Sequence, residues 1–320
     1  MSKGESTSVV VVALLCNLGI AIAKFAAAGW TQSSAMLSEA IHSLVDTCNQ
    51  VLLLFGLKRS ERPADARHPF GYSKAIYFWS FVVAILLFSM GAGVALYEGY
   101  DKLLHPHPIH DPIVLYVVLA VSIALESIST WKALAAFNAG RNGGGFVDAL
   151  KNSKDPSVFA IVLEDLAALA GLTIAFVGVA AAHLGGYEQA DGIASMLIGM
   201  LLGLVAVFMA REIASLIVGE SASSEMQDAI RALIEGETGP AKSIRAIKDL
   251  KTLHLGPQDV LVAATVDFQD QETAQAVEAV TAKLSATIKA RFPEVRHFFI
   301  EVQSGEAGAI AAPAHATTSA

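Results

Sequence analysis

Six long apolar runs occupy the first two thirds of this 320-residue sequence and constrain its fold more than any other feature. A helix needs about 20 apolar residues to cross a bilayer. The chain is 54% hydrophobic and only 16% charged, whereas soluble domains carry about 25% charged residues. We therefore predict an α-helical membrane protein with six transmembrane helices, at Ser8–Trp30, Ser34–Leu57, Ala75–Tyr100, Pro112–Phe137, Ser157–Leu184 and Gln189–Arg211.

The loops between the runs indicate an orientation. Lys and Arg gather in the 2–3 and 4–5 loops, the 1–2 and 5–6 loops have none, and the 3–4 loop has only Lys102. By the positive-inside rule, both termini face the cytoplasm, or the matrix in an organelle. The first run has no convincing cleavage site and reads as a retained span. The lack of an Arg-rich transit peptide favours a bacterial inner (plasma) membrane over a mitochondrial one.

The hydrophobicity pattern changes after Gly219, where alternation of apolar and polar residues and helical periodicity replace the long apolar runs. We expect a small α+β domain with the order helix, strand, strand, helix, strand, and with its helices on one face of a three-stranded sheet. The predicted elements are Ser224–Glu235, Ile244–Leu255, Asp259–Phe268, Glu272–Arg291 and His297–Gln303. The domains would be a transmembrane domain at 1–215, a cytoplasmic domain at 216–304 and a disordered tail at 305–320.

Several functional classes are disfavoured. No basic stripe or aromatic platform suggests nucleic acid. Cys16 and Cys48 lie inside apolar runs and form neither a disulfide framework nor a CxxC site. No HExxH or Gly-x-Ser-x-Gly pattern indicates a membrane enzyme, so we expect a non-enzyme without a prosthetic group.

Ionisable residues inside the spans point to function, because a central Asp costs on the order of 2.5–3.5 kcal/mol in a membrane helix. The second span holds His42 and Asp46 one turn apart on the same face. An imidazole and a carboxylate are two ligands for Zn²⁺, and Asp165 of the fifth span is a third donor. Metal binding would displace protons. Alternatively, such groups only hold helices together. The other polar residues in the spans are Asn17, Lys24, Glu39, Asn49, Glu126, Glu164 and Asp191.

Three motifs resemble the cation diffusion facilitator family. They are the second-span run at 37–46 (LSEAIHSLVD), the 2–3 loop at 65–74 (DARHPFGYSK) and the start of the sixth span at 191–195 (DGIAS). The predicted C-terminal domain is similar to that family's ferredoxin-like cytoplasmic domain. The runs at 163–168 (LEDLAA) and 125–127 (LES) are most similar to the branch that contains the animal mitochondrial zinc transporter.

The resemblance implies a homodimer that exchanges Zn²⁺ for protons by alternating access. It also implies a tetrahedral transport site in which His42, Asp46 and Asp165 match three ligands. The fourth family position holds Ile161, so the remaining ligand is Glu164, Glu126, Asn49 or water. A site rich in carboxylates also suits Mn²⁺, Fe²⁺ or Co²⁺.

Further sites are possible. Asp65 and His68 match ligands of a second zinc site in some relatives, but the third ligand position holds Tyr72, and the alternative is a loop shaped by Pro69 and Gly71. His105, His107 and His110 of the 3–4 loop either collect metal or belong to a stiff connector. The C-terminal domain has few of the family's metal ligands, which favours dimerisation alone. The competing function for the whole chain is a non-transporting scaffold or receptor.

Overall fold

The computed structural model describes residues 3–106, 109, 111–139, 145–146, 150 and 153–304. The side chains of residues 3–16, 136, 139, 157 and 158 lie outside this description, as do His107, His110 and the predicted tail at 305–320. The chain divides into two compact units, Met1–Ile217 and Val218–Ala320, and each unit is described by itself.

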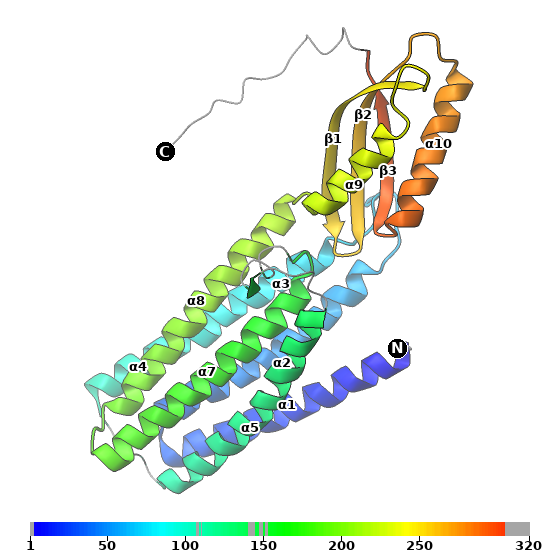
Figure 1. Cartoon of the computed structure of the whole chain (residues 1–320). Coiled ribbons are helices and arrows are strands. Elements are labelled where there is room, and N and C mark those ends of the chain that lie inside the picture. The colour runs from blue at the N-terminus through cyan, green and yellow to red at the C-terminus, as the bar shows by residue number, and fades with distance from the viewer. Residues whose placement is uncertain are drawn as a thin grey trace, which may run out of the picture. The chain divides into compact units, whose positions relative to one another are not determined.

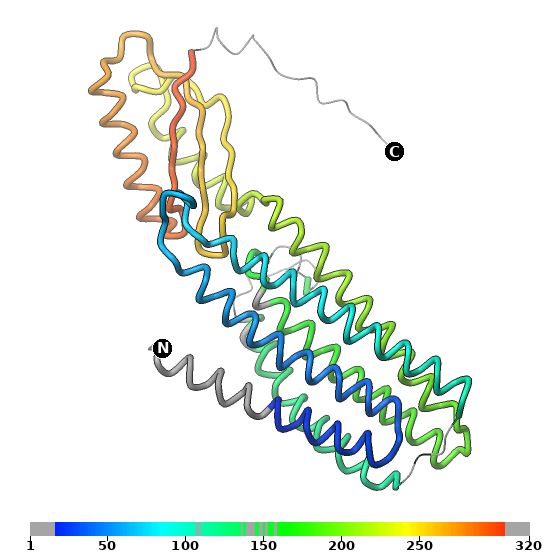
Figure 2. The backbone as a smooth tube through the Cα atoms, turned by 180° about the vertical axis from the view of Figure 1, so that it is seen from behind, coloured from blue at the N-terminus to red at the C-terminus, as the bar shows by residue number. Residues whose placement is uncertain are grey.

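The first unit consists of long helices that run side by side (Figures 1 and 2). Helix α2 contacts α1, α3, α4 and α7, and α5 contacts α1 and α7. A π-helical turn, η1 (Leu87–Ala92), joins α3 to α4 in one continuous helical segment. The helices are α1 (Lys3–Thr31), α2 (Ser34–Ser60), α3 (Ala75–Leu86), α4 (Gly93–Leu104), α5 (Pro112–Ala139), α7 (Pro156–Gly185) and α8 (Ala190–Val218).

The first unit has a largely apolar outer surface, and several ionisable side chains are buried within its apolar core. Trp131 and Leu204 are each 70% exposed, whereas Lys24 and His42 are fully buried. Such an arrangement suits lipid surroundings, where ionisable groups face the interior of the helix bundle. Within the described residues, five helical segments are long and apolar enough to cross a membrane, namely Ser34–Ser60, Ala75–Leu104, Pro112–Ala135, Phe159–Gly185 and Ala190–Val218. Helix α1 covers the predicted first span, and a sixth crossing stays a prediction.

Small residues let α4 and α8 approach closely, a common device in membrane helices. A Cβ atom on Gly99 would lie 2.6 Å from Cγ of Met196 and 2.8 Å from the carbonyl oxygen of Gly192. One turn further along, a Cβ atom on Gly199 would lie 2.9 Å from the backbone nitrogen of Leu96. These distances are too short for real side chains, so glycine is required at this seam.

Asp191 joins three elements at one end of the bundle. Its carboxylate, fully buried at the start of α8, accepts hydrogen bonds from Ser33 Oγ at 2.5 Å and from the Ser34 backbone N–H at 2.7 Å. Ser33 is also the N-cap of α2, because its Oγ accepts from the Met36 N–H. The buried Lys102 of α4 lies 4.0 Å from Asp191. The DGIAS motif thus begins with an aspartate that hydrogen-bonds to the α1–α2 turn.

The second unit contains α9 (Ser224–Glu235), β1 (Ile244–Gly256), β2 (Asp259–Phe268), α10 (Ala274–Arg291) and β3 (Val295–Val302). The strand order is β1-β2-β3, with β1 antiparallel and β3 parallel to β2. Alternate residues of β2, from Val260 to Val266, are fully buried, as the period of a half-buried strand requires. Helices α9 and α10 contact each other and share one core with the sheet. The elements appear in the predicted order.

Candidate metal centre

The centre of α2 carries the strongest pair of candidate ligands. His42 is fully buried, and its Nδ1 lies 3.6 Å from Oδ1 of Asp46, one turn later. Among the described residues, neither ring nitrogen of His42 has a hydrogen-bond partner, and Oδ1 of Asp46 has none either. Buried polar atoms are nearly always hydrogen-bonded. Three unpartnered ligand atoms on one helix face are therefore a feature that needs a functional explanation.

The two adjacent carboxylates of α7 face different helices. Glu164 is buried against α2, where Asn49 Nδ2 donates to its Oε1 at 2.9 Å. Asp165 faces α5, where Ser129 Oγ donates to its Oδ2 at 2.9 Å. Successive helical residues are about 100° apart, so the two cannot point the same way. The α7 carboxylate that contacts α2, the helix of His42 and Asp46, is thus Glu164, although Asp165 is the residue at the position of the family ligand.

Glu126 of α5 shares a small cavity with Asp46. The cavity is also lined by Asn17 and Ser43, and has room for about one water-sized sphere, about 10 Å³. Glu126, Glu164 and Asp165 all lie within electrostatic reach of Asp46. Carboxylates from two other helices, α5 and α7, thus lie around Asp46 of α2.

A buried ion pair lies one turn away from His42. Lys24 of α1 donates through Nζ to Oε2 of Glu39 at 3.2 Å and to Oγ of Ser43 at 2.8 Å. Oε1 of Glu39 lies against Gly171 of α7, where a Cβ atom would collide with it. The sequence locates Lys24 and Glu39 at membrane depth but does not pair them, because pairing depends on how the helices are rotated. Gly171 carries no sequence signal at all.

The predicted ligands do not form a closed metal site in this conformation. No three His, Cys, Asp or Glu side chains of the described residues come together closely enough to hold an ion. Position 161, the family's fourth ligand position, holds an isoleucine that is 43% exposed. The structure therefore brings His42 and Asp46 together and leaves the α7 and α5 carboxylates beside them.

The second predicted site, at Asp65 and His68, is an exposed loop. Oδ1 of Asp65 accepts from the backbone N–H groups of Arg67 and His68 at 2.9 and 2.7 Å, and Oδ2 accepts from Tyr72 Oη at 2.7 Å. The Tyr72 hydroxyl and these N–H groups hold the pKa of Asp65 below its ordinary value. Both oxygens of Asp65 thus have partners within the loop, and a second metal site at Asp65 and His68 stays a prediction.

The C-terminal unit offers weaker candidates. Nε2 of His297 lies 3.7 Å from Oδ1 of Asp259, and Nδ1 of the buried His254 lies 3.2 Å from the Gly256 carbonyl oxygen. Glu301 accepts from Thr265 Oγ1 at 2.9 Å. These groups belong to separate contacts, and in the described part of this unit none forms a cluster of three ligands.

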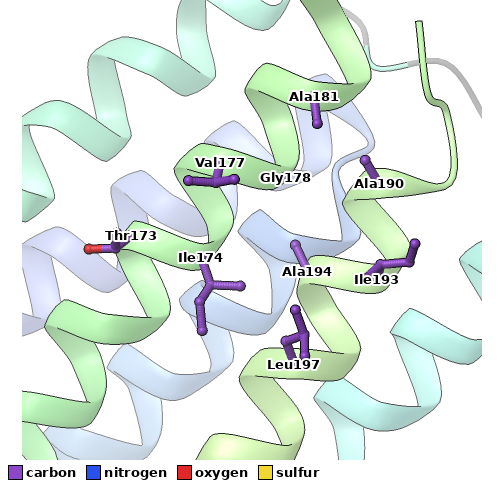
Figure 3. Close-up of a pocket in the computed structure, with 9 residues that line it drawn as sticks. All are labelled: Thr173, Ile174, Val177, Gly178, Ala181, Ala190, Ile193, Ala194 and Leu197. Carbon is purple, nitrogen blue, oxygen red and sulfur yellow. The ribbon is translucent and has the colours of Figure 1, made fainter. Parts of the chain in front are cut away.

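One pocket of the membrane unit is apolar. It has a volume of about 340 Å³ and lies between α7 and α8 (Figure 3). Aliphatic side chains such as Ile174, Val177 and Leu197 line it, and Thr173 is its one polar side chain. It offers a cation no ligands, in contrast to the polar junction around His42.

Buried ionisable residues gather at the junction of α1, α2, α5 and α7, inside the helix bundle of a multi-pass membrane protein. The chain belongs to the cation diffusion facilitator family, because the family model for the cation efflux transmembrane domain matches residues 10–218. Within that family it is related to the animal mitochondrial branch.

Three relatives illustrate the match. The protein named proton-coupled zinc antiporter SLC30A9, mitochondrial, of Homo sapiens is 33% identical over 92% of this chain. Metal tolerance protein C4 of Arabidopsis thaliana is 31% identical over 85% of this chain. The probable zinc transporter MSC2 of Saccharomyces cerevisiae is 24% identical over 65% of this chain, and the match spans 27% of the length of MSC2. The chain spans only 58% and 59% of the length of the first two.

Proposed function

We propose that this protein moves divalent transition-metal cations, Zn²⁺ first, across a membrane in exchange for protons. The observation that carries the proposal is the buried His42–Asp46 pair, whose three ligand atoms have no hydrogen-bond partner among the described residues. Family membership supports it, as do the printed names of relatives, which include a proton-coupled zinc antiporter. We propose transport and no catalysed reaction.

The ligand set that we propose is His42, Asp46 and carboxylates from α7 and α5. Glu164 is the first α7 candidate because it faces α2 through Asn49. Glu126 shares the cavity beside Asp46, and Asp165 would have to turn away from Ser129 to take part. Zinc prefers four nitrogen or oxygen ligands in a tetrahedron. Loading would therefore require α5 and α7 side chains to turn toward His42, which suits a site that opens and closes by alternating access.

Proton exchange follows from ligand chemistry. An imidazole binds metal in its neutral form and a carboxylate binds it in its ionised form, so metal binding releases protons from this group of side chains. Because position 161 lacks the family's ligand, the site has one imidazole and several carboxylates. Such a set admits Mn²⁺, Fe²⁺ or Co²⁺ beside Zn²⁺, so the preferred ion is the property to measure first.

We further propose six spans with both termini on the side where the basic loops lie, and a homodimer. The basic 2–3 loop supports the orientation. The three-stranded sheet with α9 and α10 supports a small α+β domain of the ferredoxin-like kind, and family membership supports the dimer. The human relative carries a mitochondrial name, and the comparisons give no support to the bacterial inner membrane expected from the sequence.

The test is metal flux into proteoliposomes that contain a fluorescent metal reporter, with an imposed pH gradient. We expect wild type to accumulate Zn²⁺ and the flux to collapse in His42→Ala and Asp46→Ala. The same assay with Mn²⁺, Fe²⁺ and Co²⁺ ranks the ions. Lys289→Ala, on an exposed face of α10, is the matched control and should transport as wild type does.

Two results would reject the proposal. The first is a folded, reconstituted wild type that moves none of the four ions under either direction of the pH gradient. The second is a flux that survives both substitutions on α2. Either result would favour the non-transporting scaffold or receptor.

A further inference from the structure

Lys24 is a cation fixed beside the candidate ion site. Its side chain is fully buried, and its Nζ donates to Oγ of Ser43, whose side chain lines the cavity shared with Asp46 and Glu126. Its charge acts on His42, Asp46 and Glu126. Charges interact strongly in such a poorly solvated place. A positive charge is therefore held beside the cavity that Asp46 and Glu126 line.

Glu39 is the carboxylate that forms an ion pair with Lys24. Its Oε2 lies 3.2 Å from Nζ of Lys24, and it stands one turn before Ser43 on α2, away from Asp46. Its other oxygen, Oε1, has no hydrogen-bond partner among the residues described. Along α2 the order is thus Glu39, then Ser43, which accepts a hydrogen bond from the Lys24 ammonium, and then Asp46. The ammonium of Lys24 is thus held by Ser43, whose side chain lines the cavity of Asp46 and Glu126, and Glu39 is the carboxylate that pairs with it.

From this arrangement we infer that Lys24 is the resident counter-cation that sets the affinity of the transport site. The inference rests on the proposed transport function. Without a bound metal, the ammonium offsets the negative charge of the surrounding carboxylates. When a divalent cation enters, the ammonium repels it. A transport site must bind well enough to load and weakly enough to release, and Lys24 keeps the binding weak.

Two substitutions give opposite signs. Lys24→Met, which keeps the length of the side chain and removes its charge, should tighten Zn²⁺ binding about tenfold, a factor that corresponds to 1.4 kcal/mol. The same variant should lower the maximal flux, because the ion leaves more slowly. Glu39→Gln should weaken binding, because the ammonium then faces the site without its counter-ion. A purely structural ion pair predicts a loss of affinity in both variants.

The measurement is Zn²⁺ binding to the purified full-length protein in detergent, by competition with a fluorescent chelator, together with proteoliposome flux. Lys24→Arg keeps the charge and should bind Zn²⁺ as wild type does. Lys102→Met is the matched control, since Lys102 is also a buried lysine of this unit but contacts the Gln32 carbonyl and Asp191 instead. It should leave the affinity for Zn²⁺ unchanged, whatever it does to thermal stability.

The outcomes separate the two proposals. If wild type transports Zn²⁺ but Lys24→Met leaves its affinity unchanged or weaker, the role of Lys24 is overturned and the transport function stands. If wild type neither binds nor transports metal, the transport function itself fails. Should Lys24→Met not fold, Glu39→Gln still tests the role, because unchanged or tighter binding in that variant overturns it.

Discussion

At the scale of residues, the two neighbouring carboxylates of α7 have separable roles. We expect Glu164→Gln to reduce Zn²⁺ affinity more than Asp165→Asn, because Glu164 faces α2 and Asp165 is held by Ser129. Asn49→Ala, which removes the group that orients Glu164, should cost about tenfold, the lower end for loss of a supporting hydrogen bond. Zn²⁺ titration of the purified variants measures all three. A larger loss in Asp165→Asn would instead favour the ligand that the family pattern implies.

Also at this scale, Tyr72 sets the acidity of Asp65. The pKa of Asp65 lies below its ordinary value of 3.8 chiefly because of the Tyr72 hydrogen bond. Its contribution to loop order is therefore complete above that value and is lost as pH falls through the lower folded-state pKa. Tyr72→Phe should raise the pKa of Asp65 and shift this loss to higher pH, with little effect on flux. Carbon-13 NMR of labelled aspartate carboxyls measures the pKa, and an unchanged value would contradict the assignment.

At the scale of elements, the α4–α8 seam should tolerate no side chain at Gly99. Gly99→Val would force Met196 and the Gly192 backbone aside, and overpacking of this kind costs about 1–3 kcal/mol. Gly203→Ala is the matched control, because its Cβ would lie an ordinary 3.6 Å from Cβ of Ala92. Thermal unfolding in detergent should show a lower midpoint for Gly99→Val alone. Equal midpoints would mean that the helices are not this close.

At the scale of the whole molecule, each unit has a core of its own. The second unit buries Ile230, Val262 and Ile288 in a core cluster of its own. We expect residues 218–304, expressed alone, to be soluble and to unfold cooperatively by circular dichroism. Light scattering of the full chain should give twice its mass of 33.6 kDa if the proposed dimer forms. A fragment that unfolds without a transition would show that its core is insufficient.

The helices and strands could be predicted because each depends on local pattern. Hydropathy and length locate α2 within three residues of its observed end at Ser60, and alternation gives β2 from Asp259 to Phe268. The site could be predicted only in part. His42 and Asp46 share a face by spacing alone. The choice between Glu164 and Asp165 depends on how α7 is rotated against α2 and α5, which no local pattern encodes. The same reason hides the Lys24–Glu39 pair.

The contact between Glu39 of α2 and Gly171 of α7 means that the amino acids tolerated at these two positions depend on each other. A methyl group at position 171 would collide with Oε1 of Glu39. In a chain with this packing, a residue larger than glycine therefore fits at position 171 only when position 39 holds a side chain shorter than glutamate. Across homologous sequences, position 171 should hold glycine wherever position 39 holds glutamate, and alanine should appear there only with a smaller residue at 39. In an alignment of family sequences, the buried carboxylate at position 39 would thus be detectable from a conserved glycine at position 171, which has no functional group.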